Sequence, residues 1–139
     1  MSWIFWALLS ALFAAATALL AKQGVAHVDS NLATAIRTTV VLLFAWSIVF
    51  AFGKHQALRQ LDRRTLFFLA LSGLATGLSW LCYFRALQLG PASRVAPLDK
   101  LSVPVVMLFA WLLLGEKITP LALGGGLLIT AGAVLIALA

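Results

Sequence analysis

The chain has 139 residues, of which 63% are hydrophobic and only 10% are charged, and its mean hydropathy is +1.07. This apolar share exceeds that of an ordinary soluble domain and indicates an integral membrane protein. The net charge of +6 would suggest a nucleic-acid partner in a soluble chain, but here Lys and Arg occupy short links and a few positions inside apolar segments. We therefore expect these residues to orient the protein and to contact anionic lipid headgroups, with no nucleic-acid partner.

Five long apolar segments predict membrane-spanning helices at residues 3–21, 32–52, 66–89, 92–114 and 120–139. Each segment is near the roughly 20 residues that a helix needs to cross the hydrocarbon. None alternates residue by residue, as the strands of an outer-membrane barrel do. We therefore predict an all-α integral membrane protein, with one domain over residues 1–139 that forms a five-helix bundle.

An odd number of spans places the two termini on opposite sides of the membrane. If the N-terminus is cytoplasmic, five Lys or Arg residues fall in the inner links and two at the outer ends of the spans. This count favours a cytoplasmic N-terminus, because positive charge is enriched in cytoplasmic loops. Three further cations, Arg37, Arg85 and Lys100, lie inside the spans nearer the outer side. With them the count becomes five inner against five outer Lys or Arg residues. The sequence therefore also permits insertion in both orientations.

Charged side chains inside the spans are the candidate substrate site. Arg37 lies early in the second helix, Arg85 near the end of the third, and Asp99 with Lys100 in the fourth. A lone charge at the bilayer centre costs roughly 2.5 to 3.5 kcal/mol, so each needs a partner, a headgroup, water or a ligand. At a rise of about 1.5 Å per residue, all four fall at a similar depth from one membrane face. We expect a single charged layer there.

Within this layer, Arg37 is expected to bind the substrate, because a guanidinium can hold a carboxylate or phosphate through two parallel hydrogen bonds. Arg85 could instead extend to the headgroups. Asp99 and Lys100 are neighbours and point about 100° apart on a helix, so we expect them to have different partners. Asp99 would then meet Arg37 or Arg85, and Lys100 would face a cavity. As the carboxylate deepest in a span, Asp99 is also the candidate for coupling transport to protons.

Two prolines predict an interruption of the fourth helix around Asp99. Neither Pro97 nor Pro104 can donate a backbone hydrogen bond to the preceding turn. Broken helices often line substrate sites in transporters, although proline is also tolerated in spans for structural reasons alone.

A polar and aromatic stripe at helical spacing on the third helix predicts either a pocket wall or ordinary interhelical packing. Its members are Ser72, Thr76, Trp80 and Tyr83.

Small residues mark two further faces, with Gly73 and Gly77 on the third helix and Gly125 and Gly132 on the fifth. Because small residues let helix backbones approach closely in lipid, these faces indicate either internal packing or a dimer seam.

No nucleophile constellation, glycine-rich phosphate loop or metal-ligand spacing is present in the sequence. We therefore expect neither an enzyme nor a bound metal or cofactor.

Two motifs resemble the EamA-type unit of the drug/metabolite transporter superfamily. They are YFRALQLGPASRVAPLDKL at residues 83–101 and LLLGEKIT at residues 112–119, followed by a glycine-rich last helix. The length is similar to that of the short bacterial and archaeal branch, in which a five-helix chain is half of a ten-helix inverted-repeat transporter. Residues 3–21 contain no acid, unlike the first helix of the four-helix multidrug exporters in the superfamily, which argues against their cation-exchange mechanism.

The resemblance implies a carrier in the inner membrane, with two five-helix units around a central cavity and alternating access. We expect a secondary transporter for a small polar or anionic metabolite, working as a homodimer or with a second protein as the other half. The alternative is a non-transporting membrane subunit that packs against a larger partner through its last helix.

Overall fold

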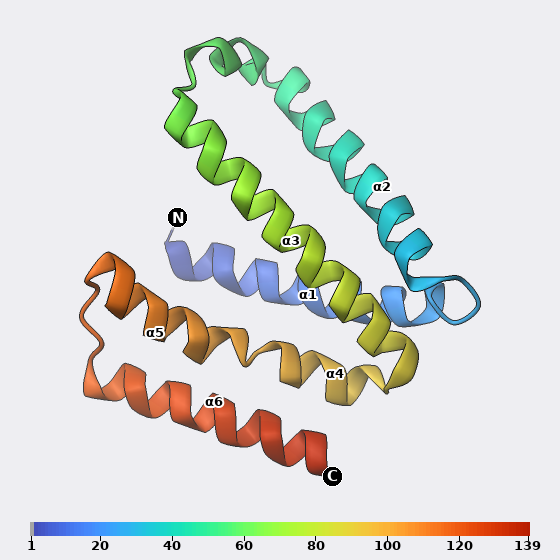
Figure 1. Cartoon of the computed structure of the whole chain (residues 1–139), viewed down its shortest axis with the longest axis vertical. Helices are drawn as coiled ribbons and strands as arrows, with labels where there is room; N and C mark the ends of the chain where they lie inside the picture. Colours follow the sequence, from blue (N-terminus) through green and yellow to red (C-terminus); the bar gives the residue numbers. More distant parts are fainter. Residues whose placement is uncertain (1) are drawn as a thin grey trace. The chain divides into compact units, whose positions relative to one another are not determined.

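The computed structural model describes residues 2–139, apart from the side chain of Arg59, and these residues form helices joined by short links (Figure 1). The elements are α1 (Trp3–Gly24), α2 (Ser30–Ala51), the 3₁₀ helix η1 (Lys54–Gln60), α3 (Arg63–Leu89), α4 (Ala92–Asp99), α5 (Ser102–Leu114) and α6 (Pro120–Leu138). Five stretches are long and apolar enough to cross a membrane, with α4 and α5 together forming the fourth. The predicted all-α, five-helix membrane fold is confirmed.

Aspartate caps explain why two helices begin earlier than expected. An Asp29 carboxylate oxygen accepts hydrogen bonds from the backbone amides of Asn31 and Leu32, at 2.9 and 3.1 Å, so α2 begins at Ser30. Asp62 likewise accepts from the amide of Thr65 at 3.3 Å, at the start of α3. The hydrogen bond from the Thr65 side chain lowers the pKa of Asp62 below its ordinary value.

Removal of the α2 cap is expected to loosen the start of that helix. Asp29→Ala deletes the acceptor for two backbone amides and should cost about 1 kcal/mol of local stability. Hydrogen exchange at Asn31 and Leu32 measures this loss. Asp29→Asn, which can still cap, should retain most of the protection, and equal loss in both variants would contradict the capping role.

Contacts divide the chain into two compact units. One contains the residues up to Lys22 together with Leu89–Ala139, and within it α4 and α5 both pack on α6 (Figure 1). The other contains Gln23–Gln88, with α2, η1 and α3.

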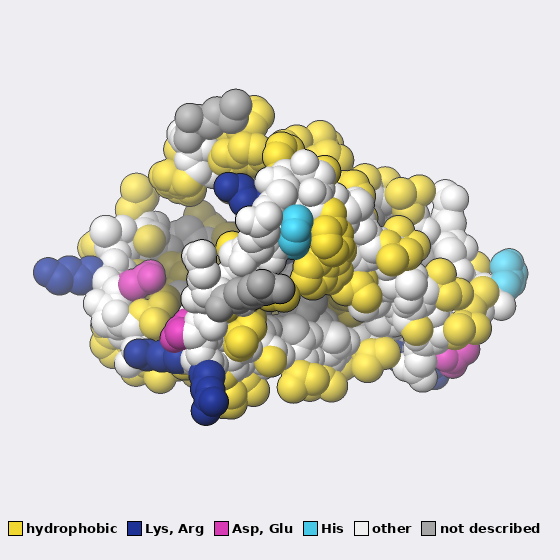
Figure 2. All heavy atoms as spheres, turned by 90° about the horizontal axis from the view of Figure 1, so that it is seen from above, with side chains coloured by type: hydrophobic (Ala, Val, Ile, Leu, Met, Phe, Trp, Pro, Cys, Tyr) yellow, Lys and Arg dark blue, Asp and Glu magenta, His cyan; other side chains and the backbone are white. Residues whose placement is uncertain are grey.

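Few side chains are buried, and the helices present large apolar surfaces. The buried hydrophobic residues among those described are Ala18, Val25, Phe84, Leu87 and Ala133. Figure 2 shows hydrophobic side chains over much of the face in view, with few charged groups among them. Such surfaces would be unfavourable in water and are matched by hydrocarbon, so they indicate a multi-pass membrane protein.

The fourth span is interrupted between its two prolines. Helix α4 ends at Asp99 and α5 begins at Ser102, which leaves Lys100 and Leu101 as the break. The amides of these two residues donate to the carbonyls of Pro97 and Leu98, each at 3.0 Å, in a tighter turn than an α-helix makes. Because Pro104 has no N–H, the carbonyl of Lys100 instead accepts from Val103 at 3.0 Å. The expected interruption therefore lies at Lys100 and Leu101.

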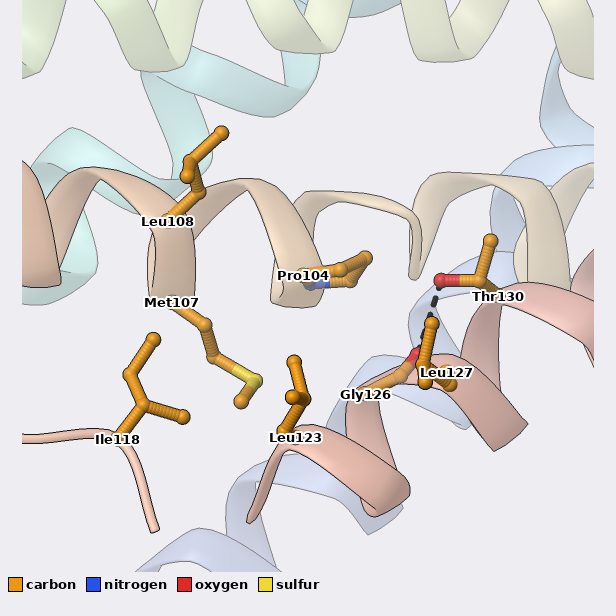
Figure 3. Close-up of a pocket in the computed structure, with 8 residues that line it drawn as sticks. All are labelled: Pro104, Met107, Leu108, Ile118, Leu123, Gly126, Leu127 and Thr130. Atoms are coloured by element: carbon orange, nitrogen blue, oxygen red, sulfur yellow. Dashed lines mark hydrogen bonds between the residues drawn. The ribbon is translucent and has the colours of Figure 1, made fainter. Parts of the chain in front are cut away.

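A small apolar cavity of about 130 Å³ lies between α5 and α6 (Figure 3). Its lining includes Pro104, Leu108, Ile118, Leu123 and Leu127. One hydroxyl is also present, but it donates to a carbonyl of its own helix, from Thr130 to Gly126 at 2.9 Å. A lining of this kind does not suit a polar substrate.

The close approach of α5 and α6 is at Gly126. A Cβ added to Gly126 would lie 3.2 Å from Met107 Sδ, whereas one added to Gly125 or Gly132 would meet nothing within 4 Å. Gly126 and Ala133 are the buried residues of α6. Within the described residues, Gly126 therefore makes the internal contact of this small-residue face, while the positions of Gly125 and Gly132 are open. The positions of Gly73 and Gly77 on α3 are also open.

Candidate substrate site

The guanidinium of Arg37 lies against two aromatic rings of α3. Its carbon Cζ is 4.2 Å from the centroid of the Trp80 ring and 5.4 Å from that of Phe84. Trp80 and Phe84 are four residues apart and so share one face of the helix. Both distances fall within the range of cation–π attraction, which is strongest for tryptophan. This contact joins the first half of α2 to the second half of α3 within one unit.

Arg37 has no acidic partner in its own unit. Neither α2 nor α3 contains Asp or Glu, and no described oxygen accepts a hydrogen bond from the guanidinium. The side chain is half-buried. Aromatic rings compensate a cation only in part and offer its N–H groups no acceptor in their plane. The arrangement therefore leaves the hydrogen-bonding capacity of the guanidinium available to an anion.

The other predicted wall residues of α3 flank Trp80 along the helix. Tyr83 is half-buried and lies about one turn after Trp80. Thr76 lies one turn before Trp80, is exposed, and donates its hydroxyl to the carbonyl of Ser72 at 2.9 Å. The structure thus brings Arg37 and Trp80 together, while the Thr76 hydroxyl hydrogen is used within α3.

Phe84, which the sequence analysis did not single out, completes the arrangement. It is only 3% exposed, so its ring is held firmly behind the guanidinium. The signal that could have found it is the spacing of four residues from Trp80. On an apolar helix this spacing is too common to be decisive.

A second polar contact, also not predicted, involves Gln88 at the end of α3. Its amide nitrogen donates to the carbonyls of Val25 and Val28, at 3.2 and 2.6 Å, and its amide oxygen accepts from Arg85 at 3.0 Å. Gln88 therefore ties the link between α1 and α2 to the end of α3. Arg85 is exposed, and the partner of its guanidinium is this neutral amide oxygen.

The expectation that Asp99 and Lys100 need different partners is wrong. Lys100 Nζ lies 3.4 Å from Asp99 Oδ2, and both side chains are exposed. The 100° separation applies to consecutive residues of a continuous helix, but α4 ends at Asp99 and Lys100 is already in the break, with ψ of −7°. The flexible lysine side chain can then fold back onto its neighbour. Arg37 and Asp99 belong to different units, so their pairing and the common charged layer stay predictions.

No group of three or more His, Cys, Asp or Glu side chains within residues 2–139 is arranged to hold a metal ion.

Five apolar spans, one of them broken, define a multi-pass helical membrane protein with an arginine against an aromatic ring inside one span. Comparison with known proteins specifies the class further. The EamA-like transporter family matches residues 1–138. A Sinorhizobium protein described as an uncharacterized transporter in the cobO 3′ region is 57% identical over 136 residues, which cover 98% of this chain and 96% of that protein. No solved structure matches the chain.

The chain therefore belongs to the EamA-like transporter family, as its motifs predicted, and is a membrane transporter.

Proposed function

We propose that the chain is a secondary transporter that moves a small polar or anionic metabolite across the inner membrane by alternating access. The observation that carries this proposal is Arg37, a cation inside a span that lies on Trp80 and has no acidic partner in its unit. Ionisable residues inside spans mark substrate paths, because placing a charge in the hydrocarbon costs free energy and such residues are therefore rare away from functional sites. Family membership supports this reading over the alternative of a non-transporting subunit.

The transporting assembly is proposed to be a dimer of five-helix units, with the N-terminus of the chain in the cytoplasm or with both orientations present. The small-residue faces at Gly73, Gly77, Gly125 and Gly132 support this assembly, since no atom of the described residues lies within 4 Å of a Cβ added at any of them. The break at Lys100 and Leu101 interrupts the helix inside a span, a feature that suits a transport path. Asp99 is the candidate carboxylate if transport is coupled to protons.

Flux into sealed proteoliposomes tests the proposed function. The purified chain is reconstituted and assayed with a panel of carboxylated, phosphorylated, zwitterionic and neutral solutes. Arg37→Ala is expected to reduce uptake of the transported solute by roughly tenfold or more, because a charge-assisted hydrogen bond to the substrate is lost.

Arg64→Ala is the matched control for this experiment. The Arg64 guanidinium also lies over an aromatic ring, 5.9 Å from that of Phe68, but at the very start of α3. Its removal should leave uptake nearly unchanged. Absence of uptake for every solute, or equal losses in the two variants, would contradict transport through Arg37.

The dimer is tested on α6. Gly125→Leu adds a side chain where the chain itself offers open space, so the five-helix unit should still fold. If this face is the seam, the bulk separates the two backbones and the dimer fraction should fall severalfold in detergent. Val134→Leu, which enlarges a residue on the opposite side of α6, should leave the dimer intact. Cross-linking and light scattering measure the dimer fraction, and an unchanged dimer in Gly125→Leu would exclude this face.

A further inference from the structure

We propose that the transported substrate carries one carboxylate as its only anionic group, and that the edge of the Arg37 guanidinium binds this group. The inference rests on the proposed function, which leaves open whether the anion is a carboxylate or a phosphate. The substrate class can be narrowed because the cations of the spans differ in their partners and because aromatic rings lie against Arg37.

Several cations of the spans already have oxygen partners. Lys100 is paired with the Asp99 carboxylate at 3.4 Å. Arg85 donates to the amide oxygen of Gln88 at 3.0 Å, and Lys22 donates to the carbonyl of Gly90 at 2.9 Å. By contrast, aromatic rings lie against the guanidinium of Arg37, and no described oxygen accepts a hydrogen bond from it. A ligand at Arg37 therefore meets one cation whose N–H donors are not used by a described oxygen.

A single cation selects for a single negative charge when the ligand must leave water. The cost of removing an ion from water rises with the square of its charge, whereas its attraction to one fixed cation rises only in proportion to the charge. A carboxylate carries one charge, while a phosphate monoester carries close to two above its second pKa of about 6. The half-buried position of Arg37 thus favours a carboxylate over a phosphate dianion.

The aromatic contact also bears on how a ligand can reach the guanidinium. Arg37 Cζ lies over the Trp80 ring at 4.2 Å and 5.4 Å from the centroid of the almost fully buried Phe84 ring, and neither ring offers an acceptor in its plane to the N–H donors. Two parallel N–H groups match the two oxygens of a carboxylate. The donors of the Arg37 guanidinium are therefore available to a carboxylate.

Binding of three matched probes to the purified chain in detergent at pH 8 tests the inference by titration calorimetry. Benzoate, benzamide and phenyl phosphate share a ring and differ in carrying one, no or about two negative charges. Butyrate, butyramide and butyl phosphate repeat the comparison without the ring. In at least one series the carboxylate is expected to bind roughly 10- to 150-fold more tightly than the amide, the factor for one charge-assisted hydrogen bond. The carboxylate should also bind more tightly than the phosphate ester.

This preference should disappear in Arg37→Ala and persist in Arg64→Ala. Tighter binding of the phosphate ester, equal binding of the amide, or no Arg37-dependent carboxylate binding in either series would overturn the inference. Proteoliposome uptake separates this failure from failure of the proposed function. Arg37-dependent uptake of a phosphorylated or neutral solute overturns the carboxylate assignment and leaves transport standing, whereas carboxylate binding without any uptake overturns transport and leaves the binding site standing.

Discussion

Arg37→Lys is expected to reduce substrate uptake by roughly tenfold or more, even though the positive charge is kept. Lysine places a compact ammonium where the structure has a planar group stacked on the Trp80 ring. It therefore loses the fork that binds two oxygens at once and much of the stacking, which is worth about 0.5 to 2 kcal/mol. Initial rates of uptake in proteoliposomes, normalised to the amount of folded protein, measure the effect.

The partner ring provides the control for this prediction. Trp80→Phe keeps an aromatic face under the guanidinium and should cost less than Trp80→Ala. In a double-mutant cycle, the effects of Arg37→Lys and Trp80→Ala should be non-additive, because both remove the same contact. Full activity of Arg37→Lys would show that only the charge matters and that the stacked geometry has no role.

Gln88→Glu is expected to destabilise the protein, although it places an acid beside Arg85. The change removes the amide N–H groups that donate to the carbonyls of Val25 and Val28, and it brings carboxylate oxygens toward those carbonyls. The substitution leaves the carbonyl of Val25 without this donor. Because Val25 is only 1% exposed, the loss should cost about 1 to 3 kcal/mol. The new ion pair with Arg85 is exposed and stabilises the folded protein by less than about 1 kcal/mol.

Unfolding of the detergent-solubilised protein measures this balance. Arg85→Ala, which removes only the exposed hydrogen bond, should have a much smaller effect than Gln88→Glu. The destabilisation of Gln88→Glu should also shrink at acidic pH, where a protonated glutamic acid can again donate a hydrogen bond. A Gln88→Glu variant more stable than the unmodified protein would show that the contact with Arg85 dominates at this position.

Much of the fold follows from the sequence, because lipid imposes strict requirements on it. A span needs about 20 apolar residues and must satisfy its own backbone, so hydropathy locates the helices to within a few residues. Deviations arise where a side chain sets the boundary, as the Asp29 cap does for α2. The prolines indicated the region of the break, but hydrogen bonds around Lys100 determine its position.

The site was only partly predictable. A charged residue inside a span is conspicuous, so Arg37 was identified from its cost, and Trp80 from its place in a stripe of helical spacing. Phe84 is one aromatic residue among many in an apolar helix, and no local pattern marks it. Gln88 acts through carbonyls 63 and 60 residues away, which spacing along the chain cannot reveal.

The contact between Asp99 and Lys100 shows where ideal helix geometry misleads. An angle of about 100° separates consecutive residues of a continuous helix, but α4 ends at Asp99, so Lys100 can reach its neighbour. On α6, small residues indicate where backbones can approach but not which of them meets a neighbour, and Gly126 is the one that meets Met107. In both cases the sequence predicted the element but not its detailed contacts.

In the proposed mechanism, the substrate contacts the guanidinium of Arg37. Phenylglyoxal, which modifies arginine side chains, tests this contact most directly when the modified sites are identified by mass spectrometry with and without saturating transported solute. The solute is expected to protect Arg37 severalfold while leaving the labelling of the exposed Arg64 and Arg94 unchanged. Unaltered labelling of Arg37 in the presence of a solute that the protein demonstrably transports would contradict this contact.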